Sequence, residues 1–218
     1  DILVPKEHYT RVVEAYSDAV DGVLSVNRVD DPWEGAAVYV SESLVLRIEE
    51  KPPRGASTTN FNNAGILILP PRVLELTERL RPSPRGEIEL PQAIEQFLGE
   101  KGRLRAVEVN GYWSDVARPR NILAMNAVIL QHRYAEGLSV DETAQVAEGV
   151  TIVPPLLVGP GVRVDSGAVV GPNVALLARS RVGARTRLEA VILGTGAAVG
   201  EECRLSHLLV EDEGNLPS

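Results

Sequence analysis

The stretch from residue 158 to 188, VGPGVRVDSGAVVGPNVALLARSRVGARTRL, decides the fold of the second part of this chain. An aliphatic side chain stands at every sixth position through this stretch and on both sides of it, with one five-residue step. The full series is Val140, Val146, Ile152, Val158, Val164, Val170, Leu176, Val182, Leu188, Leu193, Val199 and Leu205. A small or aliphatic side chain follows four positions after each of the first nine, from Ala144 to Ile192. This period is typical of a hexapeptide-repeat parallel β-helix.

In such a helix three hexapeptides make one triangular coil, and the aliphatic side chain of each points inward. Successive coils stack at the strand spacing of about 4.8 Å. The known hexapeptide helices are left-handed, an exception to the usual crossover rule. A helical or disordered segment would need a period of about 3.6 or a polar composition. We therefore predict a left-handed parallel β-helix over residues 136–218, and a first domain over residues 1–135.

In the first domain, segments with the helical period of about 3.6 residues alternate with short segments typical of strands. In residues 5–18 the apolar side chains of Tyr9, Val12, Val13 and Tyr16 recur at helical spacing, which predicts an amphipathic helix with these residues on its buried face. Further helices are expected over 70–80, after Pro91 and over 119–135, and strands over 22–29, 36–41, 44–50, 63–69 and 104–110. Strands alternating with helices predict an α/β domain with a mostly parallel sheet.

Composition and net charge exclude several classes of function. The 44% hydrophobic and 24% charged residues are typical of a globular protein, and no apolar run approaches the roughly 20 residues of a membrane span. The single Cys203 cannot form an internal disulfide, so we expect a reducing compartment, the cytoplasm. The net charge of −8 argues against nucleic acid as a partner, because nucleic-acid-binding proteins usually present a basic face. A small anionic substrate held by a lysine or a metal is compatible with this charge.

The first domain contains two candidate binding stretches. LRIEEKPP places Glu50 and Lys51 at the end of a strand, before two prolines that force a turn. A lysine can neutralise a phosphate and a glutamate can accept hydrogen bonds from sugar hydroxyls, but a solvated surface pair is the other interpretation. NNAGILIL offers Asn63 and Gly65 before an apolar run. Gly65 either lets a ligand approach the backbone or marks a β-bulge.

Two aspartates are candidate metal ligands. Asp115 precedes a helix, so it either caps that helix or provides a carboxylate for a hard cation. Mg²⁺ prefers carboxylate oxygens together with substrate phosphates, and two aspartates from distant strand ends would hold it. Asp1, the residue on which the sequence opens, is the second candidate.

Several motifs, in this order, resemble the sugar-1-phosphate nucleotidylyltransferases, and in particular their archaeal-type bifunctional members, which carry a left-handed β-helix. The motifs are DILVPKEHY from Asp1, DDPWEGAAV with Gly35, Glu50-Lys51-Pro52, Asn63-Ala64-Gly65, SPRGEIEL at 83–90 and WSDV with Asp115. Two positions depart from the family pattern. Ala117 stands where a glycine is usual, and Leu90-Pro91 stand where Thr-Asp is common.

The resemblance implies an incomplete Rossmann-like nucleotidyltransferase domain followed by the β-helix. It implies nucleotidyl transfer from a nucleoside triphosphate, dTTP or UTP, to a sugar 1-phosphate, giving a nucleotide sugar and pyrophosphate. Asp1 and Asp115 would bind Mg²⁺ and Lys51 would offset the sugar phosphate. The sugar would be bound at Gly35, Glu50, Asn63 and Gly65.

The family also has a Gly-rich loop that cradles the nucleotide phosphates, and residues 1–218 contain no counterpart to it. We therefore expect the sequence to be a fragment that is inactive by itself and lacks about the first hundred residues of its domain. Two alternatives stay open. His207 resembles the start of an acetyltransferase site, which would make the β-helix an acyltransferase acting on an amino-sugar phosphate, although a lone histidine at a coil corner is more often structural. The chain could also be a non-catalytic, oligomerising or regulatory subunit, and we expect a homo-oligomer through the β-helix in any case.

Overall fold

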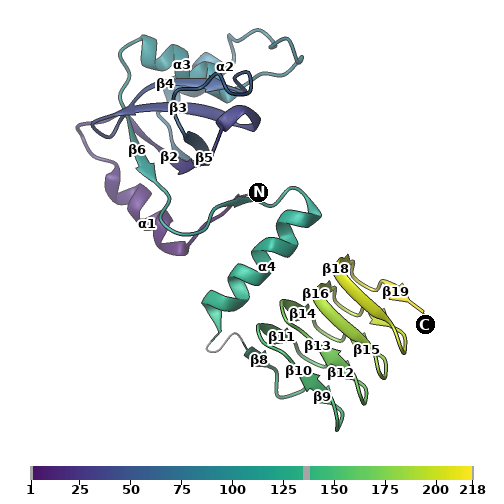
Figure 1. The fold of residues 1–218 in the computed structure, drawn as a ribbon. Coiled ribbons are helices and arrows are strands. Elements are labelled where there is room, and N and C mark those ends of the chain that lie inside the picture. The colour runs from purple at the N-terminus through teal and green to yellow at the C-terminus, as the bar shows by residue number, and fades with distance from the viewer. Residues whose placement is uncertain (1, 135–137, 218) are drawn as a thin grey trace. The chain divides into compact units, whose positions relative to one another are not determined.

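The computed structural model describes residues 2–134 and 138–217 (Figure 1). Its contacts divide the chain into two compact units, Ile2–Ser114 and the segment from Asp115 on. None of the helices in the described residues is long and apolar enough to cross a membrane.

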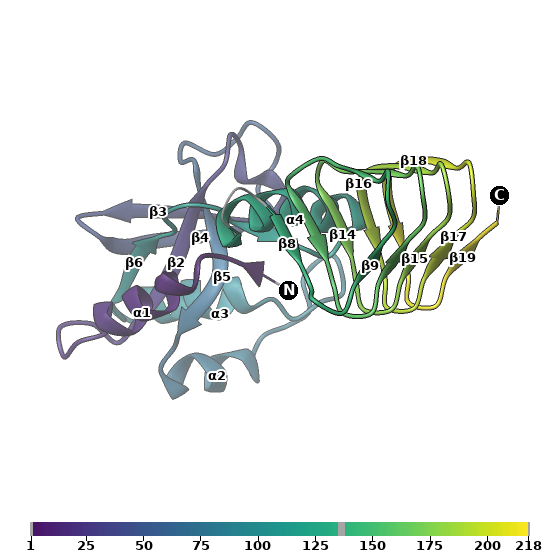
Figure 2. The ribbon, with the colours of Figure 1, turned by 90° about the horizontal axis from the view of Figure 1, so that it is seen from below.

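The first unit consists of short helices around a small mixed sheet (Figure 2). Its elements are β1 (Ile2–Leu3), α1 (Lys6–Ala15), β2 (Gly22–Arg28), the 3-10 helix η1 (Pro32–Glu34), β3 (Ala36–Ser41), β4 (Leu44–Glu50), β5 (Phe61–Ile68), α2 (Pro71–Thr77), α3 (Leu90–Gly99), β6 (Leu104–Glu108) and β7 (Ser114–Asp115). The strands pair in the closed order β2-β5-β3-β4-β6, and β1 pairs separately with β7.

The prediction of a mostly parallel sheet is wrong. Within the closed sheet of the described residues, β2 and β6 run parallel, whereas the pairs β2–β5, β3–β4, β3–β5 and β4–β6 are antiparallel. The reason lies in the connections, because no α-helix separates β2, β3, β4 and β5 along the chain, only the short 3-10 helix η1. Glu42 and Ser43, both with positive φ (48° and 68°), join β3 to β4 as a two-residue hairpin turn. A parallel neighbour would need a crossover of a dozen or more residues.

Helix α1 is present, but it buries a different face from the predicted one. Val12 is 3% exposed as expected, whereas Tyr9 and Val13 are 50% and 66% exposed. His8 takes their place at 1% exposed, and its Nε2 lies 2.8 Å from the Ser25 hydroxyl on β2. A buried hydrogen-bonded histidine therefore sets the rotation of the helix, which apolar spacing alone does not reveal.

The core of the first unit lies between the sheet and the helices α2 and α3. Helix α3 buries Ile94 and Phe97 as the sequence predicts, and Leu90 and Leu98 pack against the same cluster. Helix α2 adds Val73 and Leu76. A smaller apolar cluster joins Ile2 and Val4 to residues from β5 and from the segment before β7.

The second unit is a parallel β-helix of about four coils, preceded by the helix α4 (Pro119–Arg133). Its strands are β8 (Leu138–Val140), β9 (Gln145–Val146), β10 (Thr151–Ile152), β11 (Leu156–Val158), β12 (Arg163–Val164), β13 (Val169–Val170), β14 (Val174–Leu176), β15 (Arg181–Val182), β16 (Arg187–Leu193), β17 (Ala198–Val199), β18 (Arg204–Val210) and β19 (Asn215–Leu216). Thr151 pairs with Val169, 18 positions later, as three hexapeptides per coil require. Leu188 pairs with Leu205, 17 positions later, which accommodates the five-residue step.

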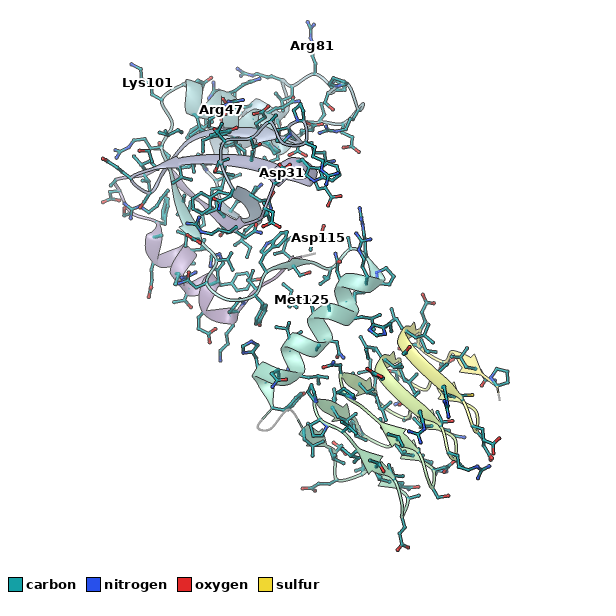
Figure 3. The ribbon with its side chains drawn as sticks, viewed as in Figure 1. Asp31, Arg47, Arg81, Lys101, Asp115 and Met125 are labelled. Carbon is teal, nitrogen blue, oxygen red and sulfur yellow. The ribbon has the colours of Figure 1, made fainter. Side chains whose placement is uncertain are left out.

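Helix α4 packs against β14, β16 and β18, so that it covers one face of the β-helix. Met125, labelled in Figure 3, and Leu130 are its buried side chains. Asn126 donates a hydrogen bond of 3.0 Å from Nδ2 to the carbonyl of Asn173. By its contacts α4 thus groups with the β-helix, while the domain boundary near residue 135 stays a prediction from the change of period.

Candidate functional site

The candidate site begins where β4 ends. Glu50 is the last residue of the strand and pairs with Ala36 of β3. Lys51 has a left-handed backbone (φ 42°) and donates its N–H to the carbonyl of Gly35 at 2.7 Å. The sequence motifs around Gly35 and Glu50-Lys51 therefore lie side by side. Because the chain turns at Lys51, the Glu50 and Lys51 side chains need not point to opposite faces of the sheet, as neighbouring residues within a strand do.

Gly35 fits its place because a buried asparagine lies against it. A Cβ atom at Gly35 would overlap Asn62 Oδ1 and would lie 3.0 Å from Asn62 Cγ. Asn62 Oδ1 accepts the Ala36 N–H at 3.1 Å, and Asn62 Nδ2 donates to Asn27 Oδ1 at 3.0 Å. The sequence did not single out Asn62, although an asparagine inside a strand-forming run is a signal for a buried polar contact.

The turn that follows Lys51, at residues 54–55, contacts residues 31–33, which precede Gly35 in the chain. Gly55 donates its N–H to Asp31 Oδ2 at 2.7 Å, and the Arg54 guanidinium lies 5.5 Å from the centre of the Trp33 ring. Figure 3 shows Asp31 close to the loops at this side of the unit. These contacts fix the loop that leads from β4 to β5 on the same side as Gly35.

Asn63 and Gly65 form a β-bulge. Asn63 Oδ1 accepts the Gly65 N–H at 3.0 Å, Gly65 has φ 81°, and the register between β2 and β5 shifts at this point. A Cβ atom at Gly65 would lie 2.9 Å from Ile2 Cγ1. The bulge interpretation of Gly65 is therefore confirmed, and the positive φ, together with the close Ile2 side chain, accounts for the glycine.

An open groove of about 550 Å³ runs beside Glu50. It is lined by Arg47, Ile48, Glu49, Glu50, Ser83, Pro84, Arg85, Glu89, Pro91, Gln92, Glu95 and Gln96. The lining joins the end of β4 to the SPRGEIEL stretch and to helix α3, which lie more than thirty positions further along the chain. The groove therefore combines two of the motifs on which the resemblance rests.

Two cations and two carboxylates meet beside this groove, and three of the four, Glu50, Arg85 and Glu89, line it. Arg85 Nη2 lies 2.7 Å from Glu89 Oε1 and 3.6 Å from Glu50 Oε1, and Lys51 Nζ lies 4.0 Å from Glu50 Oε1. The Glu89 side chain is only 8% exposed, and Gln92 donates to its other oxygen at 3.3 Å. The sequence analysis assigned no role to Arg85 and Glu89, because they lie more than thirty positions after Glu50 and only the fold brings them next to it.

Burial dominates the titration of Glu50. Desolvation raises the pKa of its carboxyl group, and the nearby Glu89 and Glu87 act in the same direction. Lys51 and Arg85 oppose this shift by stabilising the charged form. A half-buried carboxylate with adjacent cations can accept hydrogen bonds from hydroxyl groups while the cations attract an anion.

Asp115 lies at the end of β7. The preceding Trp113 donates its indole N–H to the Ala64 carbonyl at 3.0 Å, which ties the WSDV stretch to the Asn-Ala-Gly stretch. Asp115 Oδ1 accepts the Ala117 N–H at 3.0 Å, and the N-cap of α4 is Arg118. Asp115 therefore closes a turn before the helix and does not cap its first residue.

The second predicted metal ligand, Asp1, lies outside the described residues. Strand β1, which starts one residue later, pairs with β7. Over residues 2–134 and 138–217 no group of three or more His, Cys, Asp or Glu side chains is placed to hold a metal ion. Of the two predicted metal ligands, Asp115 is the one that lies among the described residues.

His207 lies on β18 in the second unit. Its side chain is exposed and its backbone is left-handed (φ 52°), as is that of Ala190 one coil earlier (φ 50°). Both residues stand at the same corner of the β-helix, between the pair Glu189–Ser206 and the pair Val191–Leu208. This is the corner position that the structural interpretation of His207 expects.

Comparison with known proteins identifies related sequences for the first unit and α4. The profile of the nucleotidyl transferase family matches residues 4–132. The bifunctional protein GlmU of Methanococcus maripaludis strain C5 is 36% identical over 122 residues, covering 53% of this chain and 29% of GlmU. Glucose-1-phosphate thymidylyltransferase of Streptomyces griseus is 32% identical over 113 residues, covering 51% of this chain and 31% of that enzyme.

The chain thus spans less than a third of the length of these two relatives. A solved structure from Bacillus anthracis, assigned as a glucose-1-phosphate thymidylyltransferase and determined with sucrose, is similar with a TM-score of 0.51 at 23% identity. The similarity covers 62% of this chain and 54% of that one, and at this identity it supports the fold alone.

Proposed function

The chain belongs to the nucleotidyl transferase family, and from this premise we propose that it takes part in transfer from a nucleoside triphosphate to a sugar 1-phosphate. The products would be a nucleoside diphosphate sugar and pyrophosphate. The observation that carries the proposal is the end of β4, where Glu50 lines the groove and Lys51 turns back onto Gly35. We propose that this end of the groove holds the sugar phosphate.

The reaction asks for positioning and charge neutralisation more than for acid–base chemistry. A phosphate oxygen of the sugar 1-phosphate forms a bond to the α-phosphorus of the nucleotide, the bond from that phosphorus to pyrophosphate breaks, and the nucleophile is already an anion. Lys51 and Arg85 would attract the sugar phosphate. Glu50 would accept hydrogen bonds from the sugar hydroxyls, with Gly35 and the Asn63–Gly65 bulge shaping the sugar site.

We propose Asp115, together with Asp1, as the ligands of Mg²⁺. The Asp115 carboxylate is exposed and offers the hard oxygen atoms that Mg²⁺ prefers, and Mg²⁺ commonly takes its other ligands from water and substrate phosphates. When bound, the ion would neutralise the charge on the phosphates. Asp115 would hold one oxygen toward it while the Ala117 N–H keeps the carboxylate oriented.

The resemblance of the sequence motifs to the sugar-1-phosphate nucleotidylyltransferases, together with the name of the Streptomyces griseus relative, guides the choice of substrates. We propose UTP with N-acetylglucosamine 1-phosphate and dTTP with glucose 1-phosphate as the pairs to test first, in the cytoplasm, without a nucleic-acid or membrane partner. We also propose that the β-helix joins copies of the chain into a homo-oligomer. Leu138 and Val140 of the first coil, which are 38% and 44% exposed, support this by leaving apolar surface uncovered at one end.

Binding of a sugar 1-phosphate to the chain tests the proposal without the nucleotide. Isothermal titration with glucose 1-phosphate and N-acetylglucosamine 1-phosphate would compare the unaltered chain with Lys51→Ala. Loss of a charge-assisted contact of about 1.5–3 kcal/mol should weaken binding about tenfold or more. Lys101→Ala is a matched control, because Lys101 is also exposed and also has a left-handed backbone (φ 69°). Equal affinity of the two variants would refute the role of Lys51.

A further inference from the structure

The β-helix carries register-paired, exposed arginines on two of its faces, Arg163 with Arg181 and Arg187 with Arg204, and no ion pair of 4.0 Å or less involves these four among the described residues. The face of Arg163 and Arg181 has a third arginine beside them. This face is formed by β9, β12, β15, β17 and β19, and helix α4 packs elsewhere, against β14, β16 and β18. The outward residues along it are Gln145, Arg163, Arg181, Ala198 and Asn215, each in register with the next. In each strand the following residue is aliphatic, and Val164 and Val182 are almost fully buried.

Three arginines form what we call the arginine face: Arg163, Arg179 and Arg181. Arg163 and Arg181 are direct partners on β12 and β15, so their Cα atoms lie about 4.8 Å apart and their side chains leave the same side of the sheet. Arg179 lies in the turn that leads into β15, and its side-chain stem passes over Gly161 of the coil before. All three residues are exposed.

No carboxylate neutralises this group within the described residues. No ion pair of 4.0 Å or less involves Arg163, Arg179 or Arg181 there, and the exposed Asp165, two positions after Arg163, makes none with them. Arg185, in the next turn, shows the contrast. It pairs with Glu202 at 2.9 Å and with Glu201 at 3.2 Å.

Like charges directly opposite each other on neighbouring strands destabilise a sheet. The cost is notable in a chain whose net charge is −8, because acidic residues that could offset the arginines are abundant. Along the coil axis the face has neutral neighbours, Gln145 on one side and Ala198 on the other. The position is therefore kept cationic although the surrounding chain is acidic.

We propose that the arginine face binds an oligophosphate group, such as that of a nucleoside triphosphate or of inorganic pyrophosphate. Guanidinium groups bind phosphate oxygens through paired N–H donors, and they keep their charge at any physiological pH. Two guanidiniums one strand spacing apart, with a third beside them, match a compact ligand that carries several charges. The inference is independent of the transfer reaction proposed above.

The charge pattern along the β-helix favours a compact ligand over a polymer or a second copy. Acidic residues lie in the coils on both sides of the arginine face, at 141–142 and 148 before it and at 189, 201–202 and 211–213 after it, where they outnumber the arginines Arg185, Arg187 and Arg204. An extended polyanion or an anionic membrane would meet this net negative charge. A second copy related by a rotation axis along the coils would place arginines against arginines at the same height.

Calorimetric titration of the whole chain with inorganic tripolyphosphate tests the proposal, at an ionic strength of about 0.01 M where charges act over about 30 Å. We expect binding, and we expect the double variant R163Q/R181Q to weaken it about tenfold or more. The charge-matched control is R81Q/R103Q, which removes two exposed arginines from the first unit. Circular dichroism would verify that both variants are folded.

Further titrations identify the source of the oligophosphate. Pyrophosphate and UTP are compared: tighter binding of UTP assigns the face to a nucleotide, and tighter binding of pyrophosphate assigns it to the inorganic ion. The proposal is overturned if R163Q/R181Q binds as the unaltered chain does, if the control variant loses as much affinity, or if inorganic phosphate and sulfate bind as well as tripolyphosphate.

Thermal unfolding gives a readout that does not depend on calorimetry. Without added anion, R181Q should unfold at a higher temperature than the unaltered chain, because it removes the repulsion between Arg163 and Arg181. Tripolyphosphate should raise the unfolding temperature of the unaltered chain but not that of R163Q/R181Q. A lower unfolding temperature for R181Q would contradict the repulsion on which the argument depends.

Discussion

Replacement of Gly35 by alanine tests the way the candidate site is held in place. The new methyl group would overlap Asn62 Oδ1, so the Asn62 side chain would have to move. It would then lose its contacts with the Ala36 N–H and with Asn27 Oδ1, both of which are buried. A buried polar group left without a partner costs about 1–3 kcal/mol, so the two groups together should lower the free energy of unfolding by about 2–6 kcal/mol.

The double variant Gly35→Ala/Asn62→Ala makes the prediction specific. Asn62→Ala alone should cost at least as much as Gly35→Ala, because it removes the same two hydrogen bonds and also the one that Asn62 Nδ2 donates to the Asn63 carbonyl. In the double variant the methyl group of residue 35 occupies space that the carboxamide has left. The double variant should therefore be close in stability to Asn62→Ala, with a strong favourable coupling between the two changes.

Urea denaturation followed by the fluorescence of Trp33 and Trp113, which both lie in the first unit, would measure these free energies. Hydrogen exchange at the Ala36 amide would report the loss of its acceptor directly. Effects that add to within about 0.5 kcal/mol would refute the reasoning, because independent sites behave in that way.

Two further predictions concern stability. Burial, followed by the charge of Arg11, lowers the pKa of His8 below its usual 6.5, so the folded state binds fewer protons than the unfolded state. The free energy of unfolding should therefore fall as the pH drops below about 6.5 toward the folded pKa. Denaturation series at several pH values should show a smaller fall for His8→Gln, and an unchanged dependence on pH would contradict this role of His8. Leu176→Ala, at a fully buried position of the six-residue series, should cost about 2–5 kcal/mol in urea denaturation. Val140→Ala, at the first position of the same series, should cost far less because Val140 is 44% exposed, and equal losses would contradict this difference in burial.

The β-helix could be predicted from the sequence almost coil by coil. Every hexapeptide meets the same surroundings, so the same side chain recurs wherever the chain turns inward. Even the five-residue step from Leu188 to Leu193 reappears as a coil of 17 residues in place of 18. The prediction succeeded because the repeat depends on local spacing and on contacts with the next coil only.

The sheet of the first unit could not be predicted in the same way. Its strand segments were located correctly, but their directions depend on the connections, and the positive φ angles of Glu42 and Ser43 that close the β3–β4 hairpin have no glycine or asparagine to signal them. The rotation of α1 was missed for a related reason. His8 is polar, so a search for apolar spacing passes over it, although its bond to Ser25 decides which face is buried.

The role of the Glu50-Lys51 pair could not be predicted from the sequence motif alone. If the pair were only a solvated turn, both side chains would be exposed, and Lys51 at 43% fits that description. Glu50 at 19% does not, because Arg85 and Glu89, more than thirty positions later in the chain, lie beside it in the lining of the groove. Neither interpretation of the motif could be chosen from the motif itself, since what distinguishes them is the burial of one carboxylate by a distant segment. That burial raises the pKa of Glu50 and places it among two cations, and a binding site differs from a surface ion pair in this respect.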